Sequence, residues 1–113
     1  MNNANITDYI ALLEPIKKAQ EVFNSKWKLP IIITLLAGNC KFNEIGRSLP
    51  SISSKVLTKE LRELQEFAIV KRTASGANLD IKYSVESNDQ ELRQIIEAYR
   101  IFSIALTNRN NRD

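Results

Sequence analysis

The amino-acid sequence predicts a single, mainly helical domain, residues 1–113, that carries one small β-hairpin. Apolar residues recur at helical spacing over most of the chain. Residues 81–85 instead alternate apolar and polar side chains, which is typical of a half-buried strand. Hydrophobic residues make up 43% and charged residues 26% of the chain, an ordinary balance for a globular protein with its own core.

Composition excludes several classes of function. The chain has no histidine, which removes Ser-His-Asp and Cys-His catalysis and two-His metal sites. No nucleotide loop or metal-ligand spacing is visible, so we predict neither an enzyme nor a cofactor or metal. Cys40 is the single cysteine, and no secretory signal or apolar run of about 20 residues is present. We therefore expect a cytoplasmic protein without a membrane segment.

The first elements are two consecutive helices over about residues 6–24. Pro15 fits the first turn of the second helix, where its missing N–H costs nothing. The segment before it has a similar apolar spacing and predicts a short helix of its own.

Three helices follow in the middle of the chain. Lys28 to Ala37 reads as a mostly buried helix stopped by Gly38, and residues 42–49 form a short helix ended by Pro50. Ser53 to Ala68 has the clearest pattern, with Ser53 as a candidate N-cap. One face of this helix is apolar, formed by Leu57, Leu61, Leu64 and Ala68, and the opposite face carries Lys55, Thr58, Lys59, Arg62 and Glu66.

The hairpin and a last helix complete the order of elements. Residues 69–73 and 81–85 predict two strands joined by a polar turn that contains Gly76. A long helix is expected over about 88–107, with a frayed tail after Thr107. Two helices joined by the short turn 49–53, followed at once by a hairpin, form the layout of a winged helix-turn-helix, with a three-helix core plus wing over about 14–86.

Positive charge is concentrated in that core. Residues 25–82 carry ten basic and five acidic side chains, a net +5 in a chain of net +3. A basic centre indicates a polyanionic partner, most commonly nucleic acid. The alternative is a solvated polar surface, which most soluble domains have. Glu60, Glu63 and Glu66 are interpreted as surface charge, and Trp27 as a packing residue.

In a winged helix-turn-helix, the exposed face of the second helix enters the DNA major groove. The candidate recognition residues are Ser51, Ser53, Ser54, Lys55, Thr58, Lys59 and Arg62. Arg62 is long enough to contact guanine, although it could instead pair with Glu66 one turn on. Weaker candidates for the DNA backbone and the wing are Lys26, Lys41, Lys71, Arg72, Ser75, Asn78 and Lys82.

The middle of the chain resembles the HxlR-type bacterial transcription regulators. Residues 25–28 (Ser-Lys-Trp-Lys) are similar to the Gly-Lys-Trp entry of that family, and the likeness is densest over 49–64. It covers about residues 14–86 in collinear order and implies a transcriptional regulator. Where family members often carry a Cys-Pro pair, in some of them an oxidant sensor, this chain has Glu14-Pro15. The usual proline-containing wing tip is replaced by residues 76–80, with the anionic Asp80 beside it.

Both terminal helices have apolar residues that a lone chain would leave exposed. We predict that they form a homodimer through Ile6, Tyr9, Ile10, Leu13, Tyr99, Phe102, Ile104 and Leu106, as the resemblance also implies. The predicted function is a regulator that binds a pseudo-palindromic site in double-stranded DNA as a homodimer. The alternative is a winged-helix protein-protein interaction module. A small-molecule effector near the dimer helices stays open.

Overall fold

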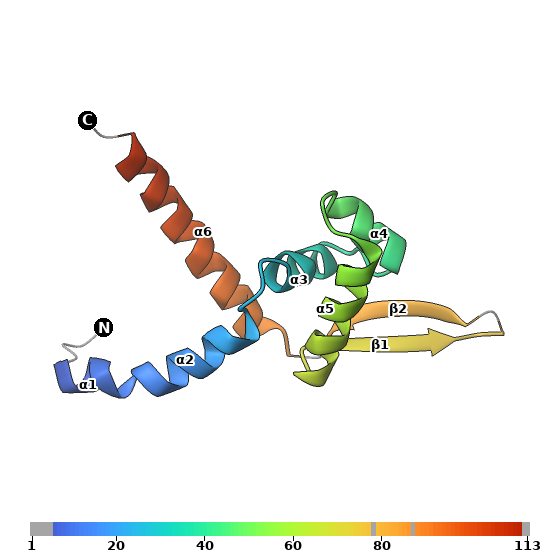
Figure 1. Ribbon diagram of the computed structural model, residues 1–113, viewed down its shortest axis with the longest axis horizontal. Coiled ribbons are helices and arrows are strands. Elements are labelled where there is room, and N and C mark those ends of the chain that lie inside the picture. The colour runs from blue at the N-terminus through green and yellow to red at the C-terminus, as the bar shows by residue number, and fades with distance from the viewer. Residues whose placement is uncertain (1–5, 78, 87, 112–113) are drawn as a thin grey trace.

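The computed structural model describes residues 6–77, 79–86 and 88–111 (Figure 1). The predicted order of elements is confirmed. The helices and strands are α1 (Ile6–Ala11), α2 (Leu13–Val22), α3 (Lys28–Leu36), α4 (Phe42–Ser48), α5 (Ser54–Glu66), β1 (Val70–Ser75), β2 (Asp80–Val85) and α6 (Gln90–Asn110). Pro15 lies in the first turn of α2, as its residue type requires.

The hydrophobic core lies where α3, α4 and α5 meet the base of the hairpin. Its buried apolar side chains come from these elements and the first turn of α6: Ile31, Ile32, Leu35, Ile45, Leu57, Leu61, Leu64, Val70 and Leu92. Trp27 is partly buried and packs against this cluster, as expected of a packing residue. The predicted leucine face of α5 therefore points inward, and its opposite face is free for another role.

Helix α5 begins as its sequence predicts. The Ser53 side-chain oxygen accepts a hydrogen bond from the backbone N–H of Val56 at 3.1 Å, which makes Ser53 the N-cap. The preceding turn brings the chain round from the end of α4, and the backbone N–H of Ile52 donates to the Leu49 carbonyl at 2.9 Å. This short turn sets α5 against α4 in a helix-turn-helix.

Helices α3 and α5 end in the same way but with different residues. In α3, Gly38 has a φ of +105° and closes a pair of terminal hydrogen bonds, from Gly38 N–H to Leu35 and from Asn39 N–H to Thr34. In α5 the matching position is Ala68, with a φ of +60°. The helix thus ends at Glu66, and Ala68 is exposed, so its placement on the leucine face was wrong. The left-handed backbone turns its side chain away from that face.

The hairpin is a two-stranded antiparallel sheet in which Val70 pairs with Val85 and Ser75 with Asp80. It is longer than predicted at its tip, where Gly76 and Leu79 both have positive φ. A hydrogen bond from the Tyr83 N–H to the Cys40 carbonyl, 2.8 Å long, ties β2 to the loop between α3 and α4. The base of the hairpin is thereby fixed to the helical core.

The terminal helices extend away from this core (Figure 1). The radius of gyration is 17.2 Å, whereas a compact chain of this length would have about 13 Å. Helix α2 buries no side chain and α6 buries only Leu92 among their described residues. Helix α6 continues to Asn110, so the predicted frayed tail after Thr107 was wrong. Among the described residues, no helix combines the length and apolar character that crossing a bilayer requires.

Candidate nucleic-acid interface

The solvent-exposed face of α5 is centred on Lys55 and Arg62. Both lie opposite Leu57 and Leu64 on the helix, and both are exposed. No ion pair joins either of them to a carboxylate anywhere in the described part of the chain, so the alternative pair of Arg62 with Glu66 is not formed. Two long cations thus lie two turns apart on the same helix face, with their charges directed to solvent.

The hydroxyl candidates lie at and near the start of the same helix. Ser51, Ser53 and Ser54 are exposed at the turn that leads into α5. Thr58 donates its hydroxyl to the Ser54 carbonyl at 2.8 Å, which leaves its oxygen able only to accept. Backbone N–H groups and the positive end of the helix dipole favour negative charge at this end of α5.

Lys59 lies at the edge of the exposed face. Its Nζ is 3.2 Å from Glu63 Oε2 and 3.9 Å from Glu60 Oε2, and its side chain is 56% exposed. Unlike Lys55 and Arg62, this candidate cation already has intramolecular partners.

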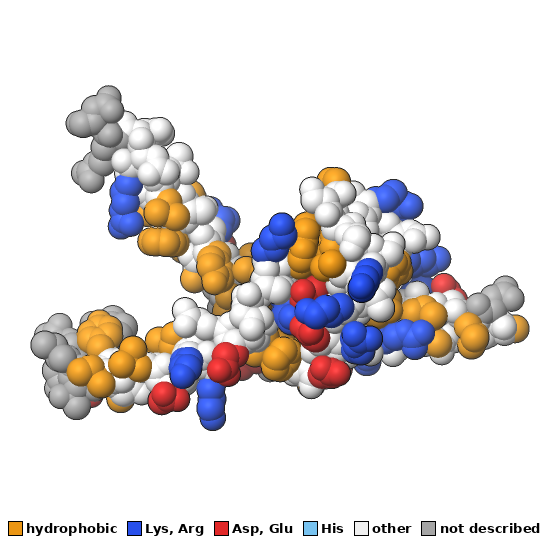
Figure 2. Space-filling model, viewed as in Figure 1, with side chains coloured by type: hydrophobic (Ala, Val, Ile, Leu, Met, Phe, Trp, Pro, Cys, Tyr) orange, Lys and Arg blue, Asp and Glu red, His pale blue; other side chains and the backbone are white. Residues whose placement is uncertain are grey.

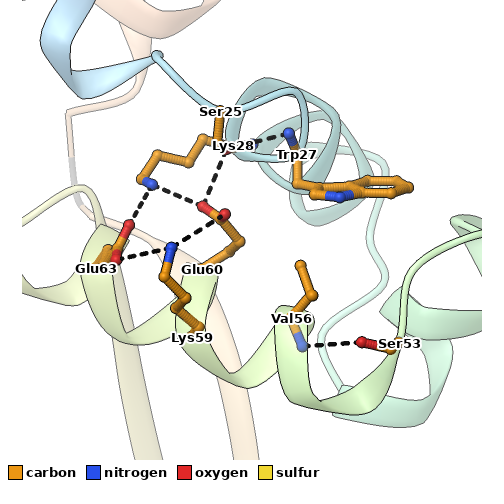
Figure 3. A network of polar contacts seen from close by, with 8 residues as sticks. All are labelled: Ser25, Trp27, Lys28, Ser53, Val56, Lys59, Glu60 and Glu63. Carbon is orange, nitrogen blue, oxygen red and sulfur yellow. Dashed lines mark hydrogen bonds and ion pairs between the residues drawn. The ribbon is translucent and has the colours of Figure 1, made fainter.

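Glu60 and Glu63 belong to a polar network that sequence reasoning missed (Figure 3). Lys28 Nζ of α3 lies 2.6 Å from Glu60 Oε1 and 2.5 Å from Glu63 Oε1. Ser25 donates its hydroxyl to the same Glu60 oxygen at 3.0 Å and accepts from the backbone N–H of Lys28. Lys28 is only 1% and Glu60 only 3% exposed. The interpretation of Glu60 as surface charge was therefore wrong.

A signal for this network was present in the helical spacing. Glu60 lies three residues after Leu57 and four before Leu64, and thus on the apolar face of α5. Lys28 lies three residues before Ile31 on the buried side of α3. A charge on a buried face requires an opposite charge, so the two positions could have been paired.

The network also changes proton affinity. Burial by itself would lower the pKa of Lys28, but its hydrogen bonds to Glu60 and Glu63 and their negative charge raise that pKa above the ordinary lysine value. The pKa of Glu63 lies below its ordinary value because Lys28 and Lys59 donate hydrogen bonds to it. Both groups are therefore charged over the whole physiological range.

The hairpin separates its basic residues between two faces. The strand register places Lys71, Thr73 and Ser75 on one face with Lys82. Arg72 lies on the other, beside Tyr83, although its side chain is exposed. The predicted wing residues therefore do not form one surface. Asn78 lies outside the described residues.

Two further backbone candidates have neighbours of their own. Lys41 Nζ is 3.7 Å and Lys82 Nζ 3.8 Å from the carboxylate of Asp80, so the acid at the wing is balanced by two exposed lysines. Lys26 lies over the indole of Trp27, with 5.0 Å between Nζ and the ring centroid. Lys and Arg side chains are numerous around α5 and the hairpin in Figure 2, whereas apolar side chains are prominent on α6 and along α1 and α2.

The predicted dimer residues are exposed on the terminal helices. On the first two helices Tyr9, Ile10 and Leu13 are more than half exposed, and on α6 the exposed set is Tyr99, Phe102, Ile104 and Leu106. The side chain of Ile6 lies outside the described residues. Such large apolar side chains in contact with water are typical of a surface that another molecule covers.

Comparisons with known proteins agree with this architecture. The family model described as HxlR-like helix-turn-helix matches residues 22–110. The HTH-type transcriptional regulator YvaP of Bacillus subtilis is 32% identical over 81 residues, 71% of this chain and 75% of that protein. YtcD of the same organism is 35% identical over 83 residues, 73% of this chain and 66% of that protein.

A solved structure shares the fold as well. The reduced form of the transcriptional regulator YodB from Bacillus subtilis superposes with a TM-score of 0.65 at 27% identity, over 76% of this chain and 88% of that chain. The match of the family model over most of the chain, together with the helix-turn-helix and its wing, leads to one assignment: the chain belongs to the HxlR-like helix-turn-helix family.

Proposed function

We propose that this protein is a DNA-binding transcriptional regulator that acts as a homodimer on a pseudo-palindromic operator. The observation that carries the proposal is the exposed face of α5, where Lys55 and Arg62 stand opposite a buried leucine face without a carboxylate partner among the described residues. Its relatives YvaP and YtcD bear the name of HTH-type transcriptional regulators.

In this proposal α5 lies in the major groove and the hairpin contacts the flanking backbone. Arg62 contacts a base edge, and Lys55 contacts a base edge or a phosphate, since both side chains are long enough to reach the bases. Ser51, Ser53 and Ser54 contact phosphate at the start of α5. On the wing, Lys71 and Lys82 share a face and so suit one backbone strand, whereas Arg72 points to the other side.

The homodimer is proposed from the terminal helices. Their apolar side chains, the extended shape and the absence of buried residues in α2 are together explained by a second copy that covers them. A twofold axis would place two copies of α5 about 34–36 Å apart, one turn of B-form DNA. The operator should then consist of two half-sites about one turn apart.

Selection of genomic DNA fragments with the purified protein, followed by footprinting, tests the proposal. We expect enrichment of a sequence with two inverted half-sites, and binding that weakens steeply with salt because most of the affinity comes from phosphates. Recovery of random fragments without a shared sequence would contradict a sequence-specific regulator.

Substitution separates the role of α5 from that of overall charge. Arg62→Ala and Lys55→Ala should each cost about 1–3 kcal/mol of specific binding. Lys18→Ala is the matched control, because Lys18 is an exposed lysine of α2 that is not among the residues proposed to contact DNA. Equal losses in all three variants would mean that only net charge matters.

A further inference from the structure

Helix α5 has no net charge of its own. Its three cations and three carboxylates balance, and these are Lys55, Lys59, Arg62, Glu60, Glu63 and Glu66. The net charge of α5 therefore gives it no attraction for a polyanion, and a carboxylate without a counter-charge close to a phosphate would oppose binding. The acidic residues of α5 therefore need a counter-charge from elsewhere in the fold.

Lys28 of α3 supplies that counter-charge from the core side. It contacts both Glu60 and Glu63, at 2.6 and 2.5 Å, while its own side chain is 2% exposed. Ser25 adds a hydrogen bond to Glu60 and accepts one from the Lys28 backbone, so the start of α3 and the middle of α5 are joined at several points (Figure 3). Buried in this way, Lys28 has no access to DNA itself.

Lys59 approaches the same two carboxylates from the solvent side. It is 56% exposed and its closest carboxylate oxygen, on Glu63, is 3.2 Å away. An exposed ion pair of this kind adds little to the stability of a protein. When Lys59 leaves, Lys28 still neutralises one of the two carboxylates and hydrogen-bonds both.

We propose that Lys28 is a positioning residue for DNA binding, which holds Glu60 and Glu63 from within the core so that Lys59 is released to contact a DNA phosphate. The proposal rests on the DNA-binding function proposed above. Without Lys28, Lys59 would be the principal cation beside two carboxylates and would remain with them.

The test measures how much Lys59 contributes to the salt dependence of binding. The slope of log K against log salt changes by about 0.9 for each phosphate contact in B-form DNA. Lys59→Gln is introduced into the wild-type chain, into Lys28→Met/Glu60→Gln and into Lys28→Met/Glu60→Gln/Glu63→Gln. The double background removes a buried charge together with its partner, which protects the fold. The duplex is the one recovered by the genomic selection.

In the wild type, we expect Lys59→Gln to reduce the magnitude of the slope by about 0.9, the value of one phosphate contact. In the double background the reduction should be less than half of that, because Lys59 is the only cation left beside Glu63 there. Removal of the Glu63 charge in the triple background should restore the full contribution. Urea unfolding of every variant keeps any loss of stability separate from the loss of this contact.

Two results would overturn the inference, and they are distinguishable. An equal contribution of Lys59 in the wild type and the double background would show that Lys28 serves stability alone, with the DNA-binding function intact. A wild-type protein that selects and binds no duplex would remove the proposed function and this inference with it.

Discussion

Helices α3 and α6 each carry a pair of isoleucines that lie in opposite surroundings. Ile31 and Ile32 of α3 are 0% exposed, whereas Ile101 and Ile104 of α6 are 57% and 49% exposed. Helix α3 is enclosed by α4, α5 and β2, while most of α6 runs free of the core. The comparison shows that the chain has one core that it completes itself and a second apolar surface that it does not cover.

The self-completed core should show the largest effect of substitution. Leu64→Ala removes a side chain that is 0% exposed and should destabilise the protein by about 2–5 kcal/mol, since it leaves a cavity in the hydrophobic core. Urea unfolding followed by circular dichroism measures this loss. If the core is independent of the second copy, the loss stays the same over a range of protein concentrations.

The uncovered surface should respond differently. Phe102→Glu places a charge within the apolar face of α6, where Phe102 is 52% exposed, and should weaken self-association by tenfold or more, roughly 1–4 kcal/mol. Sedimentation velocity over a dilution series gives the dissociation constant. Gln94→Glu is the control, because it adds the same charge at an exposed polar position of α6.

A stable monomer of the wild-type protein at micromolar concentration would contradict this half of the comparison. A dimer that Phe102→Glu leaves unchanged would locate the interface elsewhere on the molecule.

Sequence patterns predicted the helices and strands of the core better than the contacts between them. The periods of α3 and α5, the Ser53 cap and the strand alternation of residues 81–85 follow from local physics, and all of these appear in the structure. The ion pair of Lys28 with Glu60 joins residues 32 positions apart, so it cannot be predicted from local sequence propensities. The sequence indicated this pair only through the position of each charged residue on the apolar face of its helix, where a charge needs a partner.

The placement of candidate DNA contacts shows the same limit. Helical spacing identified the four candidates on the exposed face of the recognition helix, and the three serines were chosen for their place at its start. Spacing alone treated Lys59 like Lys55. Their difference depends on Glu60 and Glu63, and on which side of α5 the core lies. On the hairpin, Lys71 and Arg72 were both named as candidates for the DNA backbone, whereas the pleat places them on opposite faces.

The ends of α3 and α5 allow a smaller test within the core itself. Ala68 adopts a φ of +60° at the position where α3 has Gly38, and a side chain in this conformation costs about 1 kcal/mol. Ala68→Gly should therefore stabilise the protein by up to about 1 kcal/mol in urea unfolding. Gly38→Ala is the reciprocal variant and should destabilise by a similar amount or more. A loss of stability in Ala68→Gly would show that the flexibility gained by the unfolded chain outweighs the relieved strain.

The smallest effect concerns pH and a carboxylate at the edge of the core. The pKa of Glu44 lies below its ordinary value because the backbone N–H groups of Lys41 and Cys40 donate to its Oε1, each at 3.1 Å. A group whose pKa is lower in the folded state stabilises the fold above its unfolded pKa, about 4.3, and loses this contribution as pH falls through the folded value. The pKa of Glu63 is also lowered, so Glu63 loses its contribution to stability in the same acid range. The pKa of Lys28 is raised, so Lys28 keeps its contribution to stability until pH rises above about 10.4.

Stability should therefore be nearly flat between about pH 5 and 9.5 and fall on both sides. Glu44→Gln keeps an oxygen acceptor but no charge, so its stability should lie slightly below that of the wild type at neutral pH and approach it in acid. Urea midpoints of both proteins across the acid range measure the difference. A gap that stays constant after the carboxylate of Glu44 has been protonated would mean that Glu44 acts through shape and not through its charge, since both proteins are then uncharged at this position.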